Sequence, residues 1–297
     1  MPLSNLKLNY ISGILLMIFL FYMVSCHKTP IQNISLFESE PSSYALDPQV
    51  IDESSGIADS KINQDYLWVQ EDSGNPTQLF LISHDGKVKK SIFLTGVTNR
   101  DWEDMTLAMG PDPSLDYLYL GDIGDNGNTH SDYTIYRFPE PSLTVDTVRK
   151  IDKIVFRYPD GSHDAEAFIV DDLKKEIYII TKRDTLSRVY RLKAGYSESE
   201  INTLEYVTSL QFNSVVSACL SSDRQDLLIK TYAGIFHFNI KKDVSLAEVF
   251  GTNPTVVNYQ VEPQGEAISF ASDNTGFFTL SEKAFAAVVK LYGYKRR

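Results

Sequence analysis

The stretch Arg100-Asp-Trp-Glu-Asp-Met-Thr-Leu107 decides the fold, because similar short phrases recur along the chain. In each phrase a polar residue opens a run of small and apolar residues that is typical of a strand. The aligned polar residues are Ser55, Glu103, Glu166, Ser217 and Glu266, spaced 48, 63, 51 and 49 residues apart. A period of about fifty residues in strand-rich units is typical of a β-propeller.

Each repeat contains three predicted strands and one further strand before the next repeat. The triplets are 55–58, 66–70 and 78–82; 105–108, 117–120 and 134–138; 167–170, 177–181 and 189–192; 217–220, 227–230 and 235–240; and 267–270, 276–280 and 288–292. The fourth strands are 88–94, 151–158, 204–212 and 256–261, with 34–44 completing the last blade. We therefore expect an all-β, five-bladed propeller whose N-terminal strand closes the ring and hides its edges. A six-bladed ring with one degenerate blade is the alternative.

The length, the net charge and the missing motifs of the chain exclude several classes of function. The chain has 297 residues, 43% of them apolar, which suits one sizeable all-β domain. Its net charge of −11 argues against a nucleic-acid partner and an anionic membrane surface, which both require a basic face. No His-x-x-x-His, Gly-x-Ser-x-Gly or phosphate-loop motif occurs. We expect a monomer whose partner is a small molecule or a protein.

The N-terminal sequence predicts where the protein is located. Residues 1–25 carry a short apolar run typical of a secretory signal, and Met23-Val-Ser-Cys26 resembles the lipobox of bacterial lipoproteins. That resemblance implies a lipidated Cys26, a tether over 26–33, a propeller over 34–297 and a bacterial cell-envelope location, on either side of the membrane. An uncleaved anchor or an ordinary cleaved signal is the alternative. Cys219 is expected to be a small buried apolar residue.

In a propeller the first strand of each blade lines the central channel, so the five aligned residues should converge on its axis. Three facing carboxylates either raise their pKa values or hold a cation. Carboxylate and hydroxyl oxygens favour Ca²⁺, and we predict an axial calcium site at Ser55, Glu103, Glu166, Ser217 and Glu266. The alternative is a set of ordinary strand-start residues that bond to the backbone or to water.

The order Ser, Glu, Glu, Ser, Glu on five blade-opening strands resembles the calcium-activated nucleotidases of the apyrase type. The matching pieces are Glu53-Ser-Ser55, Trp102-Glu103, Glu166-Ala, Ser217-Ala and Gly265-Glu266. The resemblance implies a five-bladed propeller with axial calcium that cleaves nucleoside di- and triphosphates. Of the catalytic set, only Asp72 and Arg183 stand at matching strand ends. The phrases at 100–104, 121–126 and 164–167 also resemble uncharacterised secreted bacterial propellers, which imply no activity.

The second strand of each blade should end at the mouth of the channel, just above the ring. The residues there are Asp72, Asp122, Lys182, Arg183 and Lys230, flanked by Glu71 and Lys283. A cation with several basic groups suits a phosphate-bearing ligand, and Asp72 or Asp122 could orient an attacking water. The alternative is a rim of solvated charges that pair with one another.

The loop Gly121-Asp-Ile-Gly-Asp-Asn-Gly-Asn128 is rich in oxygen side chains. It could hold a second Ca²⁺, but such residues also form turns, which we favour. Two main hypotheses follow: a ligand- or partner-binding propeller with a central Ca²⁺, and a calcium-dependent phosphohydrolase. A lactonase or esterase is a third. The lack of a complete catalytic motif favours the binding protein.

Overall fold

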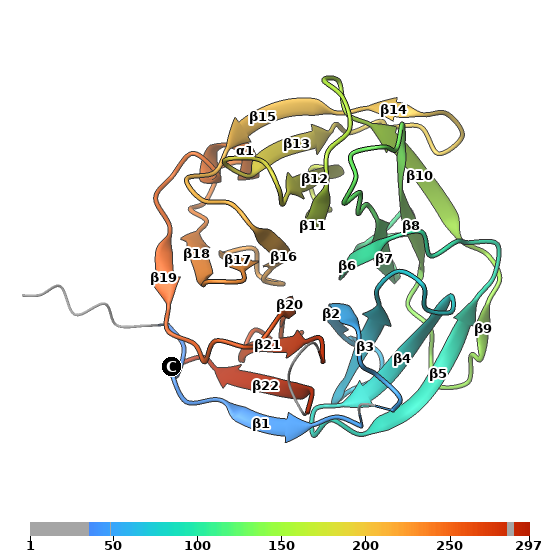
Figure 1. The fold of residues 1–297 in the computed structure, drawn as a ribbon, viewed down its shortest axis with the longest axis vertical. Coiled ribbons are helices and arrows are strands. Elements are labelled where there is room, and N and C mark those ends of the chain that lie inside the picture. Colours follow the sequence, from blue (N-terminus) through green and yellow to red (C-terminus); the bar gives the residue numbers. More distant parts are fainter. Residues whose placement is uncertain (1–35, 48, 284–287) are drawn as a thin grey trace, which may run out of the picture. The chain divides into compact units, whose positions relative to one another are not determined.

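The computed structural model describes residues 36–47, 49–283 and 288–297. The predicted signal sequence, Cys26 and the tether lie outside the described residues. Within the described part, five sheets surround a central axis, as Figure 1 shows. The five-bladed, all-β propeller is confirmed and the six-bladed alternative is wrong.

Each blade is an antiparallel sheet of four consecutive main strands. Blade one contains β2 (Ser54–Asp59), β3 (Tyr66–Glu71), β4 (Gln78–Ser83) and β5 (Val88–Leu94), and blade two contains β6 (Trp102–Met109), β7 (Asp116–Asp122), β8 (Tyr133–Pro139) and β10 (Asp152–Arg157). Blade three contains β11 (Ala165–Asp171), β12 (Glu176–Thr181), β13 (Arg188–Leu192) and β15 (Glu205–Ser209). Blade four contains β16 (Val215–Leu220), β17 (Asp226–Thr231), β18 (Ile235–Asn239) and β19 (Thr255–Val257). The predicted order of strands is confirmed.

Blade five closes the ring with strands from both ends of the described chain. It contains β20 (Gly265–Phe270), β21 (Gly276–Ser281), β22 (Lys290–Lys295) and β1 (Ser42–Ala45). The antiparallel register places Ser43 opposite Tyr292, and an isolated bridge joins Phe37 to Arg296. The N-terminal strand therefore covers the outer edge of the last blade, as predicted.

Three small elements were not predicted. The two-residue strands β9 (Thr147–Val148) and β14 (Asn202–Thr203) extend the outer edges of blades one and two in parallel pairing. The single helical turn α1 (Leu246–Val249) begins at Ser245, whose hydroxyl caps it. Its Ser-x-x-Glu pattern is a capping box, the local signal that could have revealed it.

Five hydrophobic clusters hold the ring together, one between each pair of neighbouring blades. Trp68 and Trp102 pack in the cluster between blades one and two, as expected for inter-blade residues. Their indole N–H groups donate to Glu140 and to the Thr98 carbonyl, at 3.0 and 2.7 Å. Each large buried apolar side chain contributes about 1.5–3 kcal/mol to the stability of the fold, so these clusters stabilise the interfaces between blades.

Every inner strand has an irregular register near its first residues. The shifts fall between Ser54 and Gly56, Trp102 and Met105, Ala165 and Ala167, Val215 and Ser217, and Gly265 and Ala267. Such bulges re-aim side chains and are frequent beside functional sites. They place Ser55, Glu166 and Glu266 at matching positions, whereas the matching residue of blade four is Val216, with Ser217 one position further along.

Candidate cation site at the mouth of the central channel

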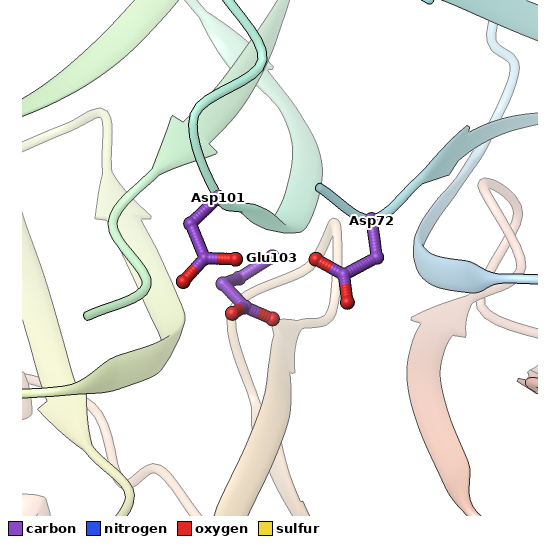
Figure 2. Close-up of side chains that lie close together, drawn as sticks. All are labelled: Asp72, Asp101 and Glu103. Atoms are coloured by element: carbon purple, nitrogen blue, oxygen red, sulfur yellow. The ribbon is translucent and has the colours of Figure 1, made fainter. Parts of the chain in front are cut away.

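Three carboxylates lie together at the end of the channel where the inner strands begin. Asp72 directly follows β3, Asp101 directly precedes β6, and Glu103 is the second residue of β6. One oxygen from each lies within 4.8 Å of the others, and Figure 2 shows the three side chains pointing toward one another. Glu103 is 6% exposed. We call these three residues the acidic cluster.

The loop after β7 forms a wall of the acidic cluster. The Ile123 and Gly124 amides both donate to the Asp101 carbonyl at 3.2 Å, and the Asp101 amide donates to Asp122 at 2.9 Å. A side chain on Gly124 would overlap Glu103 Oε1 and Asp101 Oδ2. A glycine at this position therefore lets the backbone approach the two carboxylates closely.

The rest of this loop is a hydrogen-bonded turn. Asp125 accepts from the Thr129 and His130 amides and from the Tyr133 hydroxyl, each at 2.9 Å. The Asn128 amide closes the turn on the Asp125 carbonyl, with Asn128 at φ 50°. Both Asp125 oxygens are thus engaged within the loop, which favours the turn over a second calcium site.

Lys182 lies beside the acidic cluster and connects two other predicted ring residues. Its ammonium forms an ion pair with Glu166 and donates to the Tyr232 hydroxyl at 2.8 Å. Tyr232 in turn donates to Glu266 at 2.5 Å. The second Glu166 oxygen is buried and has no hydrogen-bond partner among the described residues.

The predicted ring therefore does not form one shell of ligands. Glu103 belongs to the acidic cluster, Glu166 and Glu266 contact Lys182 and Tyr232, and Ser55 is buried at the start of the first inner strand. Ser217 lies deeper: its hydroxyl donates to Asp104 at 2.9 Å and accepts from the Ile268 amide at 3.2 Å.

Asp104 spans the channel below the acidic cluster. It is fully buried on blade two, yet it accepts from Ser217 and from the Ala218 amide, at 3.1 Å, on blade four. Burial raises its pKa to about 8. On the neighbouring blade, Gln70 donates to the Glu103 carbonyl at 2.5 Å. The contacts of Asp104 join blades two and four across the axis, and we call Asp104 with Ser217 and Ala218 the polar strut.

The predicted basic rim is neutralised by carboxylates. Lys182 pairs with Glu166, and Arg183 pairs with Asp164 and donates to Asn126. Lys230 is buried and pairs with Glu262 at 2.8 Å. Lys283 contributes a backbone bond to Asp52. The rim thus matches the alternative in which charges pair with one another, and it leaves the acidic cluster without an ion-paired cation among the described residues.

The remaining predicted rim carboxylates, Glu71 and Asp122, have local partners, and Glu71 accepts from the Asp52 amide at 3.1 Å. Asp122 accepts from the Asp101 amide and, at 3.4 Å, from the Tyr136 hydroxyl. It therefore orients the backbone of Asp101, while Asp72 is the rim carboxylate that enters the acidic cluster.

The raised pKa values of the carboxyl groups at the channel mouth reflect an excess of negative charge there. Burial, and then the Glu166 carboxylate, raise the pKa of Glu103 well above its usual range. Burial and the neighbouring Asp72 raise the pKa of Asp101 to about 6. Burial lowers the pKa of Lys182, but the carboxylates of Glu166 and Glu266 outweigh it and raise this pKa overall. A divalent cation in the acidic cluster would relieve the repulsion.

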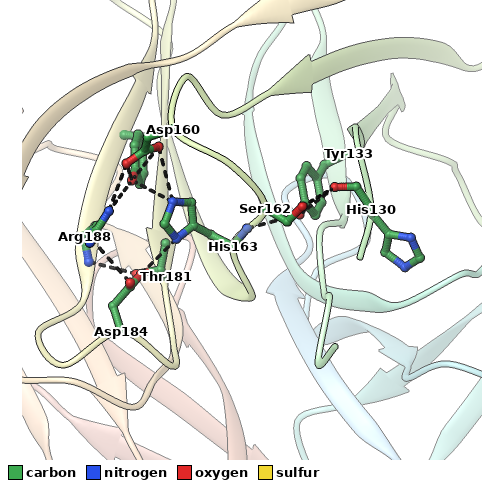
Figure 3. Close-up of polar contacts among 9 residues, drawn as sticks. His130, Tyr133, Asp160, Ser162, His163, Thr181, Asp184 and Arg188 are labelled. Carbon is green, nitrogen blue, oxygen red and sulfur yellow. Dashed lines mark hydrogen bonds and ion pairs between the residues drawn. The ribbon is translucent and has the colours of Figure 1, made fainter. Parts of the chain in front are cut away.

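A second polar group, drawn in Figure 3, supports the loops near the mouth. The His163 ring lies between Asp160 and Asp184, with 3.2 Å between each ring nitrogen and the carboxylate oxygen that it faces. The His163 amide donates to the Tyr133 hydroxyl at 3.2 Å, which in turn donates to Asp125. His163 therefore ties blade three to the loop after β7, and its two ring nitrogens point to different carboxylates.

No protein-family model matches the sequence, and a comparison with curated proteins finds no significant relative. The likeness to calcium-activated nucleotidases consequently depends on the short motifs alone. Among the described residues, no helix is long and apolar enough to cross a membrane.

Proposed function

We propose that this propeller is a ligand-binding protein whose channel mouth holds a divalent cation, Ca²⁺, in the acidic cluster. The convergence of Asp72, Asp101 and Glu103 within 4.8 Å carries this proposal. Two further observations support it: the unpartnered buried oxygen of Glu166, and the close approach of Gly124 to the carboxylates.

The donor set favours a hard cation. Carboxylate oxygens suit Ca²⁺ or Mg²⁺, whereas zinc and copper sites use histidine or cysteine. Mg²⁺ requires a near-ideal octahedron and retains several waters, whereas Ca²⁺ accepts irregular oxygen shells. Three carboxylates from two neighbouring blades, with water completing the shell, therefore fit Ca²⁺ better.

The test is a thermal-unfolding titration of the full-length protein with CaCl₂ after chelation. We expect calcium to raise the Tm of wild type and to have little effect on Glu103→Gln, because the substitution removes a charged ligand from the cluster. Glu200→Gln is the matched control, because Glu200 is exposed and only its backbone amide and carbonyl form hydrogen bonds among the described residues. Equal calcium shifts in wild type and Glu103→Gln would contradict the site.

A calcium-dependent phosphohydrolase is the second candidate. The half-exposed Arg183 guanidinium, beside Asn126 in the loop that walls the acidic cluster, favours it, because a bound cation would offset the negative mouth and let Arg183 meet a phosphate. Turnover of ADP or UDP that requires calcium and is lost in Arg183→Ala would support hydrolysis. Calcium binding without turnover would leave the binding function.

We also propose that Cys26 carries a lipid that anchors the propeller in a bacterial cell envelope. The motif Met23-Val-Ser-Cys26 supports this, and several acyl chains on one cysteine would hold a protein on a membrane. Cys26→Ser should move the protein from the membrane fraction to the soluble fraction. Unchanged membrane association would contradict lipidation at this residue.

A further inference from the structure

The opposite end of the channel contains a cavity of about 250 Å³ that the cation site does not use. All five inner strands contribute to its lining: Asp59 from β2, Thr106 from β6, Val170 from β11, Leu220 from β16 and Ser269 from β20. On β6, Thr106 lies three residues beyond Glu103, about 10 Å along the strand. Because Asp104 lies between them, the polar strut separates this cavity from the acidic cluster.

The charged residues that line the cavity are compensated by partners. The contacts join Lys61 to Asp116 at 2.6 Å, Arg224 to Asp171 and Asp172, and Asp59 to His84 at 2.6 Å and to the Ser272 amide at 2.7 Å. The acidic cluster, in contrast, has carboxylates with no paired cation in the described part of the chain. Each charged residue of the cavity lining therefore already has a partner that an ionic ligand would have to displace.

Hydroxyl groups remain available in this lining. The side chains of Thr106, Ser222 and Ser272 line the cavity, and none of these three hydroxyls has a hydrogen-bond partner among the described residues. Leu107 and Leu220, both half-buried, form apolar parts of the wall. A hydroxyl donates and accepts, so this wall matches a ligand that itself presents hydroxyls on an apolar frame.

We propose that this cavity binds a neutral, polyhydroxylated molecule about the size of one monosaccharide. A cavity of about 150 Å³ in another protein holds one benzene ring. The larger volume here accommodates a six-membered ring with several substituents. The paired charges favour a neutral sugar over a sugar acid or an amino sugar, because an ionic group would have to break an existing ion pair or hydrogen bond of the lining.

The experiment is saturation-transfer NMR and titration calorimetry on the full-length protein with glucose, galactose and mannose, and with glucuronate and glucosamine as charged probes. At least one neutral sugar should bind saturably, with calcium present or absent. Thr106→Val keeps the side-chain shape and removes the hydroxyl, and it should weaken binding about tenfold. Ser272→Ala gives an independent second test if Thr106→Val folds poorly.

Thr134→Val is the matched control, since Thr134 is also a half-buried strand threonine of blade two but lies outside the cavity lining. It should leave sugar binding unchanged. The proposal is overturned if no neutral sugar binds saturably, if glucuronate or glucosamine binds more tightly, or if Thr106→Val and Ser272→Ala both bind like wild type.

Discussion

The two ends of the central channel use the same five inner strands for opposite purposes. Strand β6 brings Glu103 to one end and Thr106 to the other, with Asp104 bridging the channel between them. At the mouth, three carboxylates meet without a paired cation among the described residues, whereas each charged residue of the opposite cavity has a partner. The comparison indicates that charge pairing, more than residue type, distinguishes the proposed cation site from the proposed site for a neutral ligand.

The largest expected effect comes from breaking the strut that divides the two ends. Asp104→Ala leaves the Ser217 hydroxyl and the Ala218 amide without their acceptor in a buried site. We expect a loss of about 3 kcal/mol in the free energy of unfolding, measured by urea titration. Asp104→Asn keeps the volume and one acceptor and should lose less. A wild-type stability in Asp104→Ala would show that the strut does not join the blades.

A substitution that blocks the acidic cluster alone should weaken calcium binding without affecting the cavity at the opposite end of the channel. An added side chain in Gly124→Ala overlaps Glu103 and Asp101, so calcium affinity should fall about 100-fold in calorimetry. Sugar binding at the far cavity should persist. Gly127→Ala, in the same loop, meets its nearest neighbour at 3.3 Å and serves as the control. If both variants bound calcium like wild type, the acidic cluster would not be the site.

The strut also predicts how stability depends on pH in metal-free protein. The Asp104 carboxyl keeps its proton up to about pH 8 in the folded state, whereas an unfolded aspartate loses it near about pH 3.9. The folded state therefore binds the extra proton in this window, and stability should decline as pH rises from about 4 to about 8. Urea titrations across this range should show the decline in wild type and a shallower one in Asp104→Asn. A stability that rose with pH equally in both would contradict the protonated strut.

The smallest expected effect concerns the competing cation at the mouth. Lys182→Gln removes the ammonium that contacts Glu166, so calcium should bind about tenfold more tightly. Lys61→Gln removes an ammonium at the opposite end of the channel and should leave calcium affinity unchanged. Weaker calcium binding in Lys182→Gln would mean that Lys182 supports the site rather than competes with the cation.

The fold could be predicted because the repeat period and the turn residues are local properties of the chain. Glu103, Glu166 and Glu266 were found because each opens an inner strand. Asp101 and Asp104 stand in the same motif but were passed over, because a bulge decides which neighbouring carboxylate faces the mouth and which crosses the axis.

Which charged residues pair across neighbouring strands and blades could not be predicted from the sequence. Lys182 and Lys230 looked like a free basic rim because their partners Glu166 and Glu262 are 16 and 32 residues away. Tyr232 directly follows β17, the second strand of blade four, and its contact with Glu266 depends on how blades four and five pack together. The far cavity likewise collects mid-strand residues, such as Thr106, that carry no motif.

The most direct test of the account is anomalous diffraction from crystals of the metal-stripped protein soaked in Mn²⁺, a hard cation that accepts oxygen ligands. We predict one strong anomalous peak within bonding distance of Asp72, Asp101 and Glu103, and none in the cavity at the opposite end. A peak at the opposite end, or no peak in the acidic cluster, would contradict the division of the channel into a cationic-ligand end and a neutral-ligand end.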